Sequence, residues 1–137
     1  MHIYTEGHAL RILVADDFEG WRQFVFFAVR ESVSFEMVGE AGDGEETLAK
    51  ARELKPDILV LDLNLPKMYG FEVARRLREA LPECKIIFFS LNMSSDCVEE
   101  SVKVGAQGYV FKTNAAADLI PAINAAAQGK TFFSKAD

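Results

Sequence analysis

Three strongly apolar segments, of which the first is continuous except for Arg11, constrain the fold of this chain most strongly. They are LRILVA, DILVLDL and CKIIFFS, at residues 10–15, 57–63 and 84–90. Segments this apolar predict strands that are covered on both faces, as in a parallel sheet. Two further strands are expected: FEMVGEA at residues 35–41 predicts a half-buried strand, and GYVFK at residues 108–112 predicts the last strand.

Segments with helical spacing of apolar residues separate these strands. In residues 18–31, for example, Trp21, Val25 and Val29 fall on one stripe. Each connection is long enough for a right-handed crossover. We therefore expect a single doubly wound α/β domain, in which a five-stranded parallel sheet carries five helices on its two faces. The expected helices cover residues 18–31, 45–54, 70–80, 95–104 and 115–128.

Pro121 lies inside the last expected helix. Proline has no amide hydrogen and is best tolerated in the first turn of a helix. If Asp118 is the N-cap, Pro121 falls in that first turn. We therefore expect the regular helix to begin near Leu119, or to be kinked there.

Composition excludes several classes of protein. The 137 residues are enough for one domain with a real core and too few for two ordinary domains. The chain has 15 basic and 21 acidic residues and a formal net charge of −6. This balance argues against nonspecific binding to nucleic acid or to an anionic membrane. No apolar run approaches the ~20 residues that span a bilayer, so no membrane association is expected.

The chain ends and the cysteines indicate a cytoplasmic protein. Residues 1–9 lack the basic start and apolar run of a signal peptide, and we expect them to form a flexible tail. Cys84 and Cys97 do not form a CxxC pair. We expect both to be reduced and buried, which is typical of the cytoplasm.

Polar side chains end four of the five expected strands. Asp16 and Asp17 follow the first strand, Asp62 lies at the end of the third, Ser90 at the end of the fourth and Lys112 at the end of the fifth. The carboxyl ends of parallel strands share one edge of the sheet, where ligands bind in folds of this type. The sequence therefore predicts that these side chains converge on one site.

Three converging carboxylates need a reason to be held together. Either Asp16 or Asp17 could cap the next helix, but capping requires one of them and leaves the second unexplained. In a partly desolvated site Asp16, Asp17 and Asp62 would repel one another unless a cation neutralised them. Oxygen ligands fit Mg²⁺, and no His or Cys lies close enough in the pattern to indicate zinc.

A magnesium site with these neighbours fits phosphoryl transfer. Asp62, on the central strand, is the candidate nucleophile and would form an aspartyl phosphate. Asp16 and Asp17 would hold the metal. Lys112 would place a positive charge near one phosphoryl oxygen, and the hydroxyl of Ser90 would donate a hydrogen bond to another.

With these residues in place, the chain resembles the receiver domain of bacterial two-component response regulators. The resemblance covers residues 10–133 and leaves residues 134–137 as a C-terminal tail or the start of a linker. It implies a flavodoxin-like fold with strand order 2-1-3-4-5. The segments VGEAGDGEETL, KPDILVLDLNLP and INAAAQGKTFFS further resemble the LuxR-type (NarL/FixJ-like) subfamily of transcription factors.

The resemblance assigns roles at the acidic site. Asp62 in DLNLP matches the phospho-acceptor, and Asp16 and Asp17 match the acidic pair. By similarity, Asp17 and Asp62 ligate Mg²⁺ directly and Asp16 does so through water. The backbone carbonyl of Asn64 would be a further ligand.

The same resemblance identifies switch residues. Ser90 matches the Ser/Thr switch, Lys112 in FKT matches the lysine of the family, and Tyr109 matches the switch aromatic. On phosphorylation Ser90 would move toward the phosphoryl group and Tyr109 would rotate inward. Asn64 and Asn92 occupy positions that tune the lifetime of the phosphoryl group in relatives.

The implied partner is a sensor histidine kinase, and acetyl phosphate is the small-molecule donor. The protein would be a signalling switch and not an enzyme, since it catalyses only its own phosphorylation and dephosphorylation. DNA binding would require a C-terminal helix-turn-helix that this chain does not contain. The chain would then be the receiver portion of a LuxR-type transcriptional regulator or a stand-alone receiver.

Two aromatic residues indicate a protein contact. In FVFFAV, the inward positions are taken by other residues, so Phe26 and Phe27 are expected to face outward. We expect this surface to form a homodimer or a partner contact. In addition, Phe18 stands where the subfamily usually has a histidine.

Three other functional classes fit the sequence less well. A phosphatase of the haloacid-dehalogenase type needs an acid two residues after its nucleophile, where this chain has Asn64, and its acid pair comes late in the sequence. A dinucleotide-binding protein needs G-x-G-x-x-G after the first strand, and ADDFEG has none. A receiver that only binds proteins, without phosphorylation, would not need the whole set of site residues.

Overall fold

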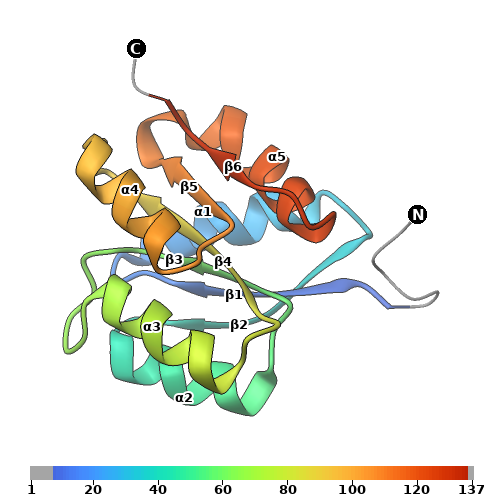
Figure 1. The fold of residues 1–137 in the computed structure, drawn as a ribbon. Coiled ribbons are helices and arrows are strands. Elements are labelled where there is room, and N and C mark those ends of the chain that lie inside the picture. Colours follow the sequence, from blue (N-terminus) through green and yellow to red (C-terminus); the bar gives the residue numbers. More distant parts are fainter. Residues whose placement is uncertain (1–7, 136–137) are drawn as a thin grey trace.

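The apolar segments form the strands of one parallel sheet (Figure 1). The computed structural model describes residues 8–135. The strand order is β2-β1-β3-β4-β5-β6, and every neighbouring pair is parallel. The strands are β1 (Leu10–Ala15), β2 (Phe35–Ala41), β3 (Ile58–Leu61), β4 (Lys85–Ser90), β5 (Gly108–Phe111) and β6 (Phe132–Phe133).

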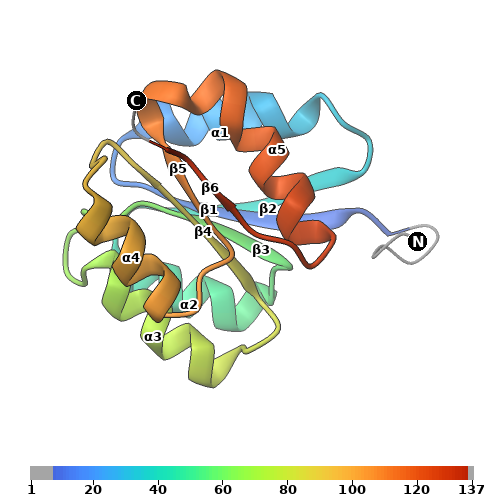
Figure 2. The same cartoon turned by 45° about the horizontal axis from the view of Figure 1, so that its top comes forward.

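Five α-helices cover the two faces of this sheet. Helices α1 and α5 lie on one face, and α2, α3 and α4 lie on the other (Figures 1 and 2). The helices are α1 (Glu19–Arg30), α2 (Gly44–Leu54), α3 (Gly70–Ala80), α4 (Ser95–Lys103) and α5 (Ala115–Ala127), with a short 3-10 helix at Lys112–Asn114. The expected α/β fold with helices on both faces is therefore confirmed.

The central strand shows why continuous apolar runs were needed. In β3, Ile58 and Val60 pack toward α1 and α5, whereas Leu59 and Leu61 pack toward the opposite helices. All four side chains are buried, because alternate residues of a strand point to opposite faces and both faces are covered.

The sheet has a sixth strand that the sequence analysis missed. After α5 the chain turns at Gly129, which has a φ of 76°, and runs beside β5. The amide of Phe132 donates to the carbonyl of Gln107 at 3.0 Å, and that of Ser134 donates to the carbonyl of Tyr109 at 2.8 Å. A strand of two residues is too short to show a period, so only the folded chain reveals it.

The last helix covers nearly all of the expected residues 115–128, but the expected start of its regular part near Leu119 is wrong. Helix α5 begins at Ala115, four residues before Leu119, and Pro121 lies inside it. Asp118 is not an N-cap; its Oδ2 accepts a hydrogen bond from Ser134 Oγ at 2.9 Å. Ala117 and Pro121 are both exposed. The carbonyl that loses its helical partner to the proline therefore lies on the solvent side of the helix, where water can satisfy it.

The two cysteines differ in burial. Cys84 is buried and Cys97 is half-buried, and both are free thiols. Burial raises the pKa of Cys84 to about 12, so this thiol stays protonated. The expectation that both thiols are buried is therefore confirmed for Cys84 and wrong for Cys97. Within the described residues, no helix is long and apolar enough to cross a bilayer. The expected N-terminal tail falls almost wholly outside these residues.

Candidate functional site

The carboxyl edge of the sheet brings together the three predicted carboxylates. Asp16 and Asp17 follow β1, and Asp62 follows the neighbouring strand β3. Each offers one oxygen, and the three oxygens all lie within 4.8 Å of one another. Asp16 and Asp62 are only 1% and 6% exposed, whereas Asp17 is exposed at the mouth of the site. The predicted clustering is therefore found.

Lys112 reaches the same cluster from the end of β5. Its Nζ lies 2.7 Å from Asp16 Oδ2 and 3.5 Å from Asp62 Oδ2. The lysine side chain is 4% exposed, so both ion pairs lie in a largely desolvated setting. One buried cation thus pairs with two of the three carboxylates, and the site keeps an excess of negative charge.

The pKa of Asp62 responds to this setting. Burial, followed by repulsion from Asp16, raises the pKa of the Asp62 carboxyl above its ordinary value. Attraction to Lys112 and a hydrogen bond from the Asn64 amide work in the opposite direction. A further positive charge would relieve the repulsion, which is the physical requirement that a bound cation would meet.

The backbone holds the two strand ends in register. The Asp62 amide donates to the carbonyl of Ala15 at 2.9 Å, and the Asp16 amide donates to that of Ala41 at 3.0 Å. Asp16 Oδ1 accepts a hydrogen bond from the Phe18 amide at 3.0 Å. Phe18 is the N-cap of α1, and its side chain makes no capping hydrogen bond. Helix capping therefore explains neither carboxylate, although one oxygen of Asp16 stabilises the turn.

The donor set fits a hard divalent cation. Asp16 Oδ2 is buried and forms an ion pair with Lys112, but it accepts no hydrogen bond of regular geometry. The cluster of Asp16, Asp17 and Asp62 offers oxygen atoms alone, as Mg²⁺ prefers. Asn64, whose carbonyl is the expected further ligand, is exposed two residues after Asp62.

The predicted switch residues form a second group at the ends of β4 and β5. Ser90 Oγ accepts a hydrogen bond from the Asn92 amide at 3.0 Å. The Tyr109 hydroxyl donates to the carbonyl of Asn92 at 2.6 Å, and its ring is fully buried. Burial raises the pKa of Tyr109 to about 12. The ring that the resemblance expects to rotate inward is thus already inside the fold here.

The side chain of Asn92 has a local partner. Its Oδ1 accepts a hydrogen bond from the Ser94 amide at 2.9 Å, and Ser94 is the N-cap of α4. This bond fixes the loop between β4 and α4, in which Asn92 is half-buried.

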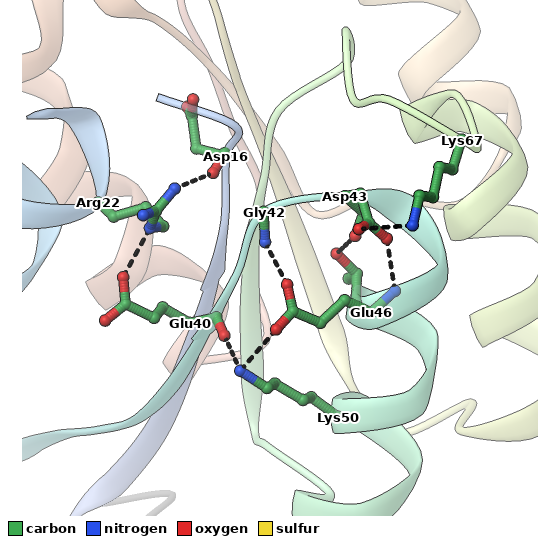
Figure 3. Close-up of polar contacts among 9 residues, drawn as sticks. Asp16, Arg22, Glu40, Gly42, Asp43, Glu46, Lys50 and Lys67 are labelled. Carbon is green, nitrogen blue, oxygen red and sulfur yellow. Dashed lines mark hydrogen bonds and ion pairs between the residues drawn. The ribbon is translucent and has the colours of Figure 1, made fainter. Parts of the chain in front are cut away.

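Sequence reasoning missed Arg22, which supports the acidic loop. Its Nη1 donates to the backbone carbonyl of Asp16 at 2.7 Å, and its Nε donates to Glu40 Oε1 at 2.6 Å (Figure 3). Arg22 lies near the start of α1, on the same helix as the apolar stripe and a few residues after the acid pair. The signal in the sequence that could have found it is a single basic residue, Arg22, soon after two adjacent acidic residues.

Further polar contacts extend from Glu40 toward the loop after β3 (Figure 3). Lys50 Nζ contacts the backbone carbonyl of Glu40 at 2.5 Å and Glu46 Oε2 at 2.9 Å. Asp43 caps α2 by accepting from the Glu46 amide at 2.8 Å, and Lys67 Nζ lies 3.7 Å from Asp43 Oδ2. These contacts connect the rim of β2 to the loop that follows Asp62.

Comparison with known proteins identifies the family. The model described as "Response regulator receiver domain" matches residues 12–124. The "Uncharacterized transcriptional regulatory protein YxjL" of Bacillus subtilis (strain 168) is 34% identical over 124 residues, which cover 90% of this chain and 57% of the relative. The chain thus spans little more than half the length of this relative.

Solved structures agree with this match. A two-component response regulator of the LuxR family from Aurantimonas sp. SI85-9A1 is 31% identical with a TM-score of 0.86, covering 91% of this chain and 89% of that one. The signal receiver domain of the putative response regulator NarL from Mycobacterium tuberculosis is 28% identical with a TM-score of 0.84, covering 90% and 99%. With the converged acidic edge, these matches show that the chain belongs to the response regulator receiver domain family and is a receiver domain of the LuxR-type two-component regulators.

Proposed function

We propose that Asp62 accepts a phosphoryl group from the phosphohistidine of a sensor histidine kinase, or from a small donor such as acetyl phosphate. The observation that carries the proposal is the arrangement of Lys112 against Asp16 and Asp62, with Asp17 at the mouth of the site. It combines a nucleophilic carboxylate, a cation for the phosphoryl oxygens and spare oxygen ligands in one place.

The proposed reaction forms one bond and breaks one. A carboxylate oxygen of Asp62 bonds to phosphorus, and the bond from phosphorus to the donor breaks. Its electron pair leaves with the imidazole nitrogen of the kinase or with acetate. Lys112 Nζ lies close enough to Asp62 to contact an oxygen of the incoming group. Receiver domains are signalling modules, so the only proposed acceptor of the phosphoryl group is the domain itself.

Asp16, Asp17, Asp62 and the carbonyl of Asn64 would hold Mg²⁺. When bound, Mg²⁺ neutralises part of the acidic charge, so that an anionic phosphodonor can approach. The contribution of the chain itself is to hold the carboxylates in place through the backbone bonds of β1 and β3.

The proposed output is a population shift between two packings of the switch residues. Ser90 would move toward the phosphoryl group and vacate space. The buried position of the Tyr109 ring, which can fill that space, would then be favoured. The hydrogen bond from Tyr109 to the loop carbonyl of Asn92 links this movement to the start of α4. The affected surface would be that of α4, β5 and α5.

As part of a cytoplasmic LuxR-type transcriptional regulator, the domain would control a C-terminal DNA-binding domain. The relative YxjL is described as a transcriptional regulatory protein, and the matched residues cover only 57% of its length, which supports this proposal. We also propose that phosphorylation promotes a homodimer, for which the surface of Phe26 and Phe27 is the candidate. A stand-alone receiver and a phosphorylation-independent binding module are the alternatives.

The test is to incubate the protein with Mg²⁺ and acetyl phosphate and to record its intact mass. We expect a gain of about 80 Da, the mass of one phosphoryl group, which is lost in Asp62→Asn. Asp57→Asn is the matched control, because Asp57 lies at the opposite edge of the sheet and accepts a hydrogen bond from the Arg11 amide. If the wild type gains no mass although it binds Mg²⁺, the binding-module alternative replaces the proposal.

A further inference from the structure

Two aromatic rings lie beside the ammonium group of Lys112. Its Nζ is 5.2 Å from the centroid of the Trp21 ring and 5.6 Å from that of the Phe89 ring. Trp21 comes from the first turn of α1 and Phe89 from β4. Among residues 8–135, these are the rings within cation–π reach of Lys112, and Asp16 and Asp62 are its acidic neighbours.

The two rings are rigidly packed. Trp21 meets Phe89 edge to face, with centroids 5.4 Å apart and an interplanar angle of 86°. Phe24 completes the cluster, 5.8 Å from Trp21 and stacked on Phe89 at 6.4 Å. Ring pairs with this geometry attract one another and hold a fixed orientation.

A lysine needs this kind of support more than an arginine does. Its ammonium sits on a flexible stem with four rotatable bonds and can choose among nearby carboxylates. Here Lys112 Nζ lies closer to Asp16 Oδ2, at 2.7 Å, than to Asp62 Oδ2, at 3.5 Å. The face of an indole ring attracts a cation most strongly when water is excluded, and the lysine side chain is almost fully buried.

We propose that Trp21 is a positioning residue for Lys112. Its ring holds the ammonium group between Asp16 and Asp62, within reach of a phosphoryl group on Asp62, and limits its collapse onto Asp16 alone. The effect of Trp21 on the phosphorylation rate rests on the proposed function, whereas the contact between Trp21 and Lys112 does not. Phe24 serves only the packing of the cluster, which makes it the matched control.

The contact is tested first in the metal-free protein by NMR. The ring currents of Trp21 and Phe89 shift the ε-methylene resonances of Lys112 from their ordinary position in the wild type. We expect Trp21→Leu to return these resonances most of the way to that position, whereas Phe24→Leu leaves them displaced. Trp21→Phe keeps an aromatic ring and retains part of the displacement.

The consequence is tested by the initial rate of phosphorylation as a function of acetyl phosphate concentration. We expect Trp21→Leu to lower the maximal rate roughly threefold to tenfold, with Mg²⁺ affinity unchanged. Trp21→Phe should recover most of the rate, and Phe24→Leu should match the wild type. A packing role alone would lower the rate equally in Trp21→Leu and Phe24→Leu.

Each result decides the proposal. Unshifted Lys112 resonances in the wild type, or equal rates in wild type and Trp21→Leu, would overturn it. If Trp21→Leu does not fold, the milder Trp21→Phe variant carries both readouts, and a spectrum identical to the wild type would count against the proposal. If the wild type takes up no phosphoryl group, the proposed function fails, while the NMR result still decides whether Trp21 positions Lys112.

Discussion

Lys112 and Asp16 form a buried ion pair, with Nζ and Oδ2 2.7 Å apart and both side chains less than 5% exposed. The pair is not isolated, because Asp62 and Asp17 add carboxylate charge beside it. The lysine is therefore a structural counter-ion in addition to its proposed role at the phosphoryl group.

Removal of this counter-ion should destabilise the fold. In Lys112→Met the buried carboxylates of Asp16 and Asp62 lose their cation, and we expect the free energy of unfolding at pH 7 to fall by about 3 kcal/mol. Urea unfolding measures this change, and added Mg²⁺ should restore part of it. Lys103→Met, at an exposed site on α4, is the control and should change little. Equal stability of the two variants would contradict the counter-ion role.

The raised pKa of Asp62 predicts a stability that depends on pH. The folded state binds this proton more tightly than the unfolded chain, so the free energy of unfolding falls as pH rises from the ordinary value of 3.8 to the raised pKa, and it stays lower above that. Without Mg²⁺, Asp62→Asn should therefore raise Tm at pH 7 by roughly 3–5 °C, and this gain should vanish in acid.

Asp43 provides a control of opposite sign for this measurement. A hydrogen bond from the Glu46 amide, with the help of nearby Lys67, lowers the pKa of Asp43. Its carboxylate therefore stabilises the fold above its ordinary pKa, and this contribution is lost as pH falls through the lowered value. Calorimetry from pH 3 to pH 8 should show Asp43→Asn less stable than the wild type at neutral pH. A gain in both variants would mean that general charge reduction is the cause.

Arg22 should matter more than its ion pair with Glu40. The Glu40 side chain is 62% exposed, so the pair itself contributes little. The bond from Arg22 to the carbonyl of Asp16 instead fixes the loop that carries the proposed metal ligands Asp16 and Asp17. We expect Arg22→Gln to weaken Mg²⁺ binding roughly threefold to tenfold, by the loss of one charge-assisted hydrogen bond, and Glu40→Gln to have a small effect. Isothermal titration calorimetry with Mg²⁺ separates the two, and similar losses would contradict the loop role.

Gly70 allows α3 to approach the loop that follows β3. A Cβ atom at this position would lie 2.6 Å from the carbonyl oxygen of Asp62 and 2.8 Å from Cα of Leu63. We expect Gly70→Ala to cost about 2 kcal/mol and to slow phosphorylation, because the backbone of Asp62, the proposed phospho-acceptor, must shift. In Gly42→Ala the added Cβ would meet Glu46 and Arg22 at 3.8 and 3.9 Å, so this control has room. Urea unfolding and the rate of mass gain test both variants.

The exposed aromatic pair on α1 tests the proposed dimer. Phe26 and Phe27 are 44% and 53% exposed, with ring centroids 5.6 Å apart, and the guanidinium of Arg30 lies 5.1 Å from the Phe27 ring. We expect Phe26→Ala to weaken self-association of the phosphorylated protein about tenfold, as loss of a buried aromatic anchor does. Analytical ultracentrifugation is the measurement, and Val33→Ala, also at an exposed apolar residue, is the control. Unchanged sedimentation in Phe26→Ala would exclude this surface.

The sequence by itself was sufficient to predict that the acidic side chains and Lys112 meet. Continuous apolar runs separated by crossover helices allow only a parallel sheet, and parallel strands end at one edge. The positions of Asp16, Asp62 and Lys112 at strand ends were therefore enough to predict that they meet. The physical reason is that strand direction and burial follow from the pattern of apolar residues, which is local information.

Tertiary structure alone decided the contacts between segments that no local pattern relates. The two-residue strand β6 exists because the chain after α5 falls beside β5, and α5 could start at Ala115 because Pro121 faces solvent. Likewise, Trp21 fits a core stripe by its spacing, yet its ring lies against the ammonium of Lys112, 91 positions later in the sequence. Such contacts depend on how helices dock on the sheet, and docking is set by the packing of the whole core.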